Sequence, residues 1–183
     1  MKRYLAISIL MLTCLLSGCA TTTNIPLESA RLIDNVPFFK QNDYQCGPSA
    51  LAGVINYWYI KKAVPKNLTV EEIVAAIYSP SARGILGIDL ESYAREKGFQ
   101  VKQYKGSIAD IKENIDGGTP LILFVEYGFF FYQLNHFIVA KGYTEKSIIV
   151  NSGRKENELI PNGELEKIWR KTGYWSLLIK PSS

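Results

Sequence analysis

Histidine and cysteine are scarce in this sequence, which holds one histidine and three cysteines among 183 residues. Cys14 and Cys19 lie close to the N-terminus, so Cys46 is the only cysteine in the rest of the chain. A single thiol cannot form an intramolecular disulfide. A structural zinc site needs more cysteine and histidine ligands than Cys46 and His136 can supply. The sequence therefore predicts no metal site, and it favours a thiol that is either buried or used.

A strong charge of one sign is also missing. The chain has 21 basic and 17 acidic residues, and the surplus falls to 19 against 17 without Lys2 and Arg3. So small a surplus gives no reason to expect nucleic acid as a partner. We find no internal repeat, no low-complexity tract and no phosphate-binding loop. The length and the 47% hydrophobic content fit one domain with its own core.

The N-terminus has the anatomy of an export signal, with Lys2 and Arg3 before an apolar run that ends near Leu16. The run is too short to span a bilayer with margin. The segment LSGC, which ends at Cys19, resembles a bacterial lipobox. This resemblance implies a lipoprotein signal peptide at residues 1–18, acylation of Cys19, and a lipidated N-terminus and tether over residues 19–34. Ala20 after the cysteine suggests the outer membrane, facing the periplasm. The alternatives are an ordinary signal peptide or a single anchoring helix.

Cys46 stands at the predicted start of a helix. Pro48 suits the first helical turn, where the missing N–H costs nothing. The positive end of the helix dipole favours a thiolate, so we expect the pKa of the Cys46 thiol to be lowered. The alternative is that Cys46 is a small, buried and inert hydrophobe. The helix is supported by apolar residues at helical spacing, namely Leu51, Val54, Ile55 and Trp58.

Periodicity and turn residues predict helices before a sheet, an α+β arrangement. After the Cys46 helix we expect helices from a capping box at Thr69 to about 78, over 88–97 and over 107–116, and from a cap at Asn162 to about 171. Strands are expected at about 99–103, 121–125, 136–142, 147–151 and 174–179. The aromatic run 129–132 is assigned to a loop or a strand edge. Gly117 and Gly118 are predicted to end a helix, which is a simpler explanation than a self-cleavage site.

Nucleophilic cysteine catalysis needs a thiolate, a base, an orienting group for that base and a donor for the oxyanion. Cys46 is the candidate nucleophile, and His136 is the only imidazole that could serve as the base. Asn151 ends the next predicted strand and could orient His136. Gln41 could donate its side-chain amide to the oxyanion together with the Cys46 N–H. Taken singly, His136 could be an ordinary strand residue, Asn151 a turn residue and Gln41 a polar loop residue.

The sequence resembles the bacteriocin-processing, double-glycine-type cysteine peptidases, a papain-like group. The resemblance is carried by VPFFKQNDYQCGPSAL, by NHFIVAKGY and by VNSG, and it spans the chain from Val36 onward. It implies a papain-like cysteine peptidase domain at residues 35–183, with N-terminal helices packed on a C-terminal antiparallel sheet. It also implies a peptide or protein substrate, hydrolysis of a peptide bond, and no cofactor.

Two positions depart from the family pattern. The third catalytic residue is usually an aspartate followed by proline, and Ser152 stands at that position here, next to Asn151. Gln41 stands five residues before Cys46, where many relatives have six and would place Lys40. The orienting group could therefore be Asn151, Ser152 or neither.

Three hypotheses about function follow from these residues. The first is an envelope lipoprotein that hydrolyses peptides through Cys46 and His136. The second is a catalytically idle peptidase fold that binds a peptide or protein partner, because the usual aspartate is missing. The third is acyl transfer or amide hydrolysis on cell-wall peptides, which would use the same residues.

Overall fold

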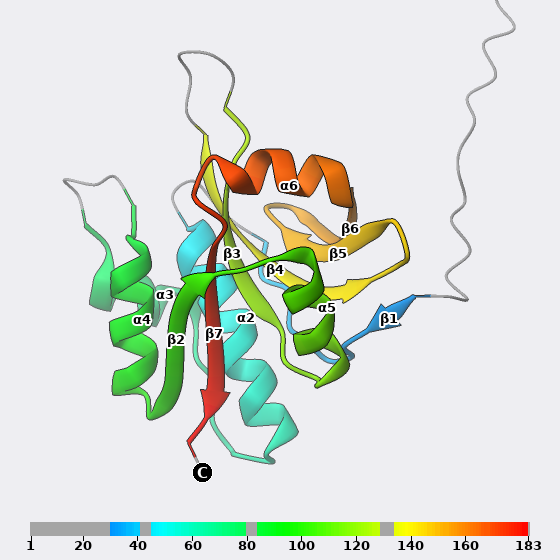
Figure 1. The fold of residues 1–183 in the computed structure, drawn as a ribbon. Helices are drawn as coiled ribbons and strands as arrows, with labels where there is room; N and C mark the ends of the chain where they lie inside the picture. The colour runs from blue at the N-terminus through cyan, green and yellow to red at the C-terminus, as the bar shows by residue number, and fades with distance from the viewer. Residues whose placement is uncertain (1–29, 41–44, 80–83, 129–133, 183) are drawn as a thin grey trace, which may run out of the picture.

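The computed structural model describes residues 30–40, 45–79, 84–128 and 134–182 (Figure 1). The predicted signal peptide, the lipidation site Cys19, Gln41 and the aromatic run 129–132 all lie outside these residues. No helix within the described ranges has the length and apolar content needed to cross a membrane.

The described chain forms five helices and a seven-stranded sheet. The helices are α2 (Cys46–Lys61), α3 (Val70–Ile77), α4 (Gly87–Glu96), α5 (Ile108–Asp116) and α6 (Asn162–Arg170). The strands are β1 (Arg31–Leu32), β2 (Phe99–Lys105), β3 (Leu121–Glu126), β4 (Asn135–Tyr143), β5 (Ser147–Ser152), β6 (Lys155–Pro161) and β7 (Trp175–Pro181).

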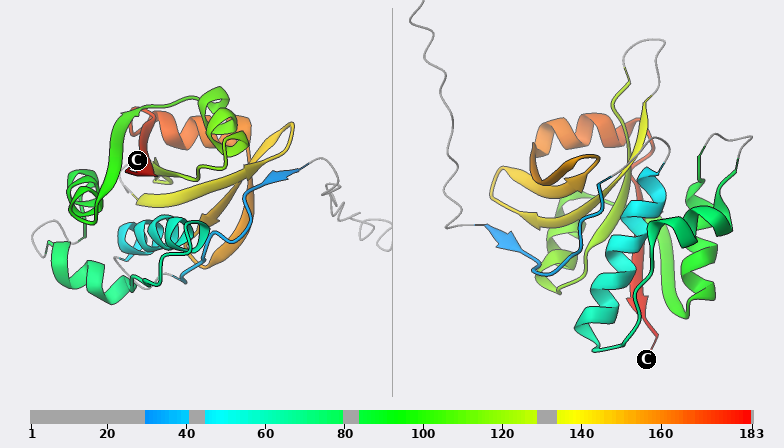
Figure 2. Two further views of the ribbon diagram at one scale, coloured as in Figure 1. Left: turned by 90° about the horizontal axis from the view of Figure 1, so that it is seen from below. Right: turned by 180° about the vertical axis from the view of Figure 1, so that it is seen from behind.

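Every strand pair in the sheet is antiparallel. The order is β2-β7-β3-β4-β5-β6, and β1 pairs separately with β4. Helices α2 and α3 lie on one side of the sheet, whereas α5 and α6 lie on the other (Figure 2). The α+β architecture expected from the sequence is therefore confirmed.

Helix α2 is the most deeply buried helix of the fold. The expected apolar stripe is present, but burial extends around the whole helix from Gly47 to Trp58. A helix that is apolar on all sides is typical of one covered by several elements. Here the sheet covers one side, through β3, β4 and β7, and α3 and α4 cover another. This burial fixes the axis of α2, and with it the position of its first residue, Cys46.

Local signals placed several element ends correctly. The Thr69 side chain accepts the N–H of Glu72, and the Glu72 carboxylate accepts the N–H of Thr69, which forms the predicted capping box. Gly98 takes the positive φ of 90° expected of a residue that follows a helix. Gly117 caps α5, and the carbonyl of Gly118 accepts the Tyr57 hydroxyl at 2.6 Å. The Gly-Gly pair is therefore a helix end that is held by α2.

One expectation was wrong, and one strand was missed. Asn162 does not cap α6, because the helix begins at Asn162 with Pro161 at the cap position. The Asn162 side-chain amide instead donates to the carbonyl of Glu145 at 3.3 Å. Strand β6 was not predicted, since its charged sequence KENELIP shows little apolar alternation. It forms because the outer edge of β5 offers backbone partners on both sides of a register shift between Val150 and Ser152.

Candidate active site

The first turn of α2 packs directly onto the beginning of β4. A Cβ atom added to Gly47 would lie 3.4 Å from Cδ2 of Phe137 and 3.5 Å from Cδ2 of Leu90. Larger side chains at Gly47 would push the helix away from the strand. The small residue after Cys46 therefore lets the helix start approach the strand that carries His136.

The Cys46 sulfur lies in this contact, and the thiol is partly buried. Burial raises the pKa of the Cys46 thiol above its ordinary value, and the backbone amides of Phe137, Gly47 and Cys46 offset part of that rise by donating toward the sulfur. The prediction of a lowered pKa was wrong, because loss of solvent outweighs the favourable amides of the helix start. At neutral pH the resting group is accordingly the thiol.

His136 is the second residue of β4 and pairs with Val125 of β3. It directly precedes Phe137, whose amide faces the Cys46 sulfur, so the fold brings the helix start and the histidine segment together. Burial lowers the pKa of His136 below its ordinary value, and the negative charge of Glu158 opposes this shift. The resting imidazole is therefore neutral near pH 7 and able to accept a proton.

No hydrogen bond joins Cys46 to His136 among the contacts of the described residues. Catalytic hydrogen bonds are often long without substrate and tighten when it binds. The resting site thus pairs a neutral thiol with a neutral imidazole. In such a pair the base must take the proton during the reaction.

Gly153 and Tyr127 are the neighbours of the His136 side chain at the end of β4 nearest α2. A Cβ atom on Gly153 would lie 3.7 Å from Nε2 of His136. The Tyr127 ring lies 6.1 Å from the imidazole, centroid to centroid; burial raises the pKa of Tyr127, and the side chain of Ser152 opposes this rise. The residue at the usual aspartate position is therefore linked to a tyrosine next to the histidine. Sequence reasoning missed Tyr127, for which no motif gave a signal.

The structure does not bring Asn151 together with His136. Asn151 lies opposite Val139, an odd number of residues from His136 along β4, so the two side chains point to opposite faces of the sheet. Its side-chain oxygen accepts the backbone N–H of Asn157 at 3.2 Å. The residue is 5% exposed and supports the turn into β6. An orienting group must hydrogen-bond to the imidazole of His136, and Asn151 does not.

We expect Asn151→Ala to lower the free energy of unfolding by about 1 kcal/mol, the usual net contribution of one hydrogen bond. Because the side chain faces away from His136, the pKa of His136 should not change. Denaturant unfolding measures the first effect, and proton NMR of the single histidine measures the second. A shifted histidine titration in a folded Asn151→Ala protein would restore Asn151 as the orienting group.

Gln41, the predicted oxyanion donor, lies outside the described residues and its role stays a prediction. The described chain leading toward it, from Val36 to Lys40, belongs to no helix or strand. Gly53 of α2 allows this segment to lie against the helix, since a Cβ there would be 2.9 Å from the carbonyl oxygen of Pro37. The approach to Gln41 is therefore anchored on the same helix as Cys46.

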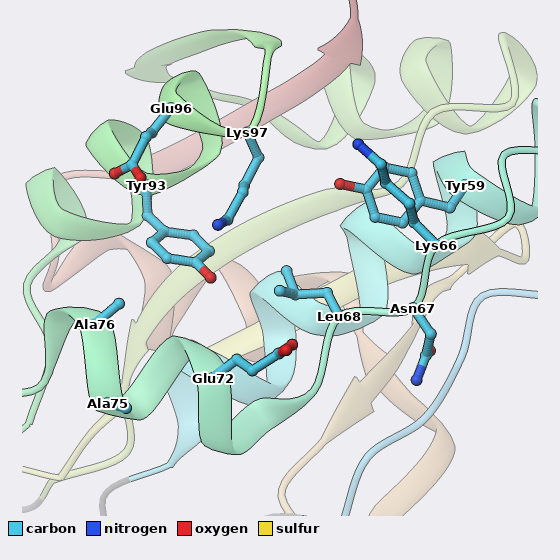
Figure 3. Close-up of a pocket in the computed structure, with 10 residues that line it drawn as sticks. All are labelled: Tyr59, Lys66, Asn67, Leu68, Glu72, Ala75, Ala76, Tyr93, Glu96 and Lys97. Carbon is cyan, nitrogen blue, oxygen red and sulfur yellow. The ribbon is translucent and has the colours of Figure 1, made fainter.

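A cavity of about 670 Å³ opens elsewhere, between α3, α4 and the end of α2 (Figure 3). Tyr59, Tyr93 and Glu72 are among its lining residues, and the Lys97 ammonium lies 4.7 Å from the centre of the Tyr93 ring. None of Cys46, His136 and Asn151 lines it. This cavity is distinct from the candidate active site.

Comparison with known proteins agrees with the geometry. The model of the Peptidase_C39 like family matches residues 33–177. A solved structure described as a C39-like peptidase from Bacillus anthracis is 16% identical, with a TM-score of 0.65, and the match covers 84% of this chain and 98% of that one. The peptidase domain of Streptococcus ComA, a bifunctional ABC transporter of a quorum-sensing pathway, is 19% identical with a TM-score of 0.64, covering 80% and 99%.

A third structure is a double glycine motif protease from an AMS/PCAT transporter in complex with the leader peptide. It is 26% identical with a TM-score of 0.62, and the match covers 83% of this chain and 96% of that one. No curated protein matches the sequence. From the matched residues and the shared fold, the chain belongs to the Peptidase_C39 like family and has the papain-like fold of its peptidase domains.

Proposed function

We propose that this chain is a lipid-anchored cysteine peptidase of the bacterial cell envelope, which hydrolyses a peptide or protein substrate with Cys46 as nucleophile and His136 as base. The observation that carries the proposal is the packing of the α2 start on β4. This packing places the partly buried sulfur of Cys46 beside the backbone amide of Phe137. Phe137 directly follows His136, whose imidazole is neutral. The leader peptide bound to the AMS/PCAT protease supports a peptide as the substrate class.

In the proposed reaction His136 takes the proton of the Cys46 thiol as the sulfur attacks the scissile carbonyl carbon. The carbonyl oxygen becomes an oxyanion, to which the Cys46 N–H and the Gln41 side chain would donate. The imidazolium then gives its proton to the leaving amine, and a thioester remains on Cys46. Water, deprotonated by His136, hydrolyses the thioester and restores the thiol.

Acylation of Cys19 would tether this domain to the outer membrane, facing the periplasm. The predicted tether, residues 19–34, includes β1 (Arg31–Leu32), which pairs with β4, so the tether would join the fold at this strand. Palmitate labelling of cells that express the full chain tests this part. We expect label on the wild type and none on Cys19→Ser.

The enzymatic part is tested by incubating the purified protein with a peptide library that includes double-glycine leader sequences. Mass spectrometry of the products should reveal a new C-terminus and a new N-terminus at one bond. Alkylation that maps to Cys46 should stop the cleavage. Transfer of the acyl group to an amine, in place of water, would indicate a transferase.

A peptide-binding module without turnover is the second candidate. It is favoured by the missing aspartate and by the lack of a hydrogen bond between Cys46 and His136 in the described structure. Binding of a peptide that survives Cys46→Ala, with no cleavage of any library member by the wild type, would support this candidate over the peptidase.

A further inference from the structure

We propose that Glu158 of β6 is the positioning carboxylate of the site and supplies to His136 a negative charge that Ser152, at the end of β5, cannot supply. The inference rests on the proposed function for its catalytic consequence. Its electrostatic part concerns the histidine alone and can be tested without a substrate.

Strand register places Glu158 on the face of the sheet that carries His136. Glu158 lies opposite Val150, and Val150 lies opposite Ala140. Ala140 is four residues after His136 on β4, and residues separated by an even number share a face. Ser152, two residues after Val150, lies on the same face and closer to the histidine. The Glu158 carboxylate and the His136 imidazole therefore lie on the same face of the sheet, and no strand separates them.

An ion pair directs the Glu158 carboxylate toward the histidine end of the sheet. Its Oε1 lies 2.7 Å from Nζ of Lys155, and Lys155 lies opposite Ser152. The Glu158 side chain is 24% exposed, whereas that of Lys155 is 72% exposed. The carboxylate is thus partly shielded from solvent, and its field is screened less than that of a surface charge. The Lys155 ammonium sits on the solvent side.

The charge of Glu158 shifts the pKa values of both His136 and Tyr127. Its charge raises the pKa of His136 against the lowering by burial, and it adds to the burial that raises the pKa of Tyr127. Other ionisable groups on the surrounding elements are Glu126 and Lys171, which lie 3.7 Å apart, together with Glu164, Arg154 and the Cys46 thiol. Of the charged groups in the described structure, Glu158 is the one that shifts His136.

The chemical consequence follows from the sign of the charges. Proton transfer from Cys46 creates an imidazolium, and a nearby carboxylate stabilises that cation. Tyr127 lies beside the ring and interacts with Ser152, and neither of them carries a negative charge at neutral pH. The site then has the uncharged Tyr127 beside His136 and the Glu158 carboxylate on β6, two strands away. Together they take the place of a single aspartate.

Proton NMR tests this inference in the full chain, because the single histidine gives one unambiguous ring titration. We expect Glu158→Gln to move the His136 pKa to lower pH and Glu158→Asp to retain part of the wild-type value. Lys155→Gln should move it the opposite way, since it removes the cation that partly neutralises Glu158. Glu156→Gln is the matched control on the same strand, because Glu156 acts on Lys141 and not on His136.

If turnover is found, Glu158→Gln should lower kcat/KM about tenfold and shift its acidic limb to lower pH, with Glu158→Asp recovering part of the loss. Equal His136 titrations in Glu158→Gln and Glu156→Gln would overturn the inference, whatever the activity. A wild type without turnover whose histidine still responds to Glu158→Gln would contradict the proposed function and leave the electrostatic assignment supported.

Discussion

Peptide hydrolysis should fall by roughly 10⁴-fold or more in Cys46→Ala, because removal of a nucleophile eliminates the covalent route. Cys46→Ser should fall nearly as far. A serine hydroxyl is a much weaker acid than the thiol, and His136, with its lowered pKa, is a weak base for it. Initial rates of cleavage of one library peptide, measured at equal protein concentration, give the comparison.

Ser49→Ala is the matched control for these variants. Ser49 lies in the same first turn of α2, and its buried hydroxyl has no hydrogen-bond partner among the residues that the structure describes. Removing an unsatisfied buried hydroxyl is neutral or mildly stabilising, so this variant should keep its fold and its activity. Undiminished turnover by a folded Cys46→Ala protein would exclude Cys46 as the nucleophile.

Trp169→Ala should lower the free energy of unfolding by about 3–5 kcal/mol, the range for truncating a fully buried tryptophan. Trp169 is 0% exposed on the inner face of α6, and its Nε1 donates to the carbonyl of Trp175 at 2.9 Å. The ring also packs on Gly106, where an added Cβ would lie 2.9 Å from Cη2 of the indole. Truncation leaves a cavity beneath α6 and an acceptor without its donor.

Urea unfolding followed by far-UV circular dichroism measures this loss. Glu166→Ala, on the exposed face of the same helix, is the control and should change the stability by no more than a few tenths of a kcal/mol. A Trp169→Ala protein as stable as the control would mean that α6 does not pack on the sheet as the structure has it.

Local chemistry made much of the fold predictable. The capping box at Thr69 and the glycine at position 98 fixed helix ends, since each depends on residues within one turn. The uninterrupted apolar run of β3 identified a central strand. Strand β6 escaped prediction because its partner, the edge of β5, is a tertiary feature. The Asn162 cap was predicted wrongly because its amide donates to the carbonyl of Glu145, in the turn between β4 and β5.

The sequence predicted which residues carry the candidate chemistry, but not how their surroundings shift their pKa values. Cys46 at a helix start and His136 on a strand follow from sequence, and the structure brings their segments together. The direction of the Cys46 pKa shift did not follow, because burial depends on the packing of Gly47 against Phe137. Asn151 was assigned from its position at a strand end, and only the register shows that it faces away.

The central claim is that Cys46 and His136 act as a pair, and the pH dependence of Cys46 alkylation in wild type and His136→Gln tests it most directly. With a raised thiol pKa and a lowered imidazole pKa, the wild-type rate should rise as His136 loses its proton below pH 6.5. It should rise again as the thiol ionises above pH 9. In His136→Gln the first rise should disappear. Superimposable profiles with only the high-pH rise would contradict the pairing.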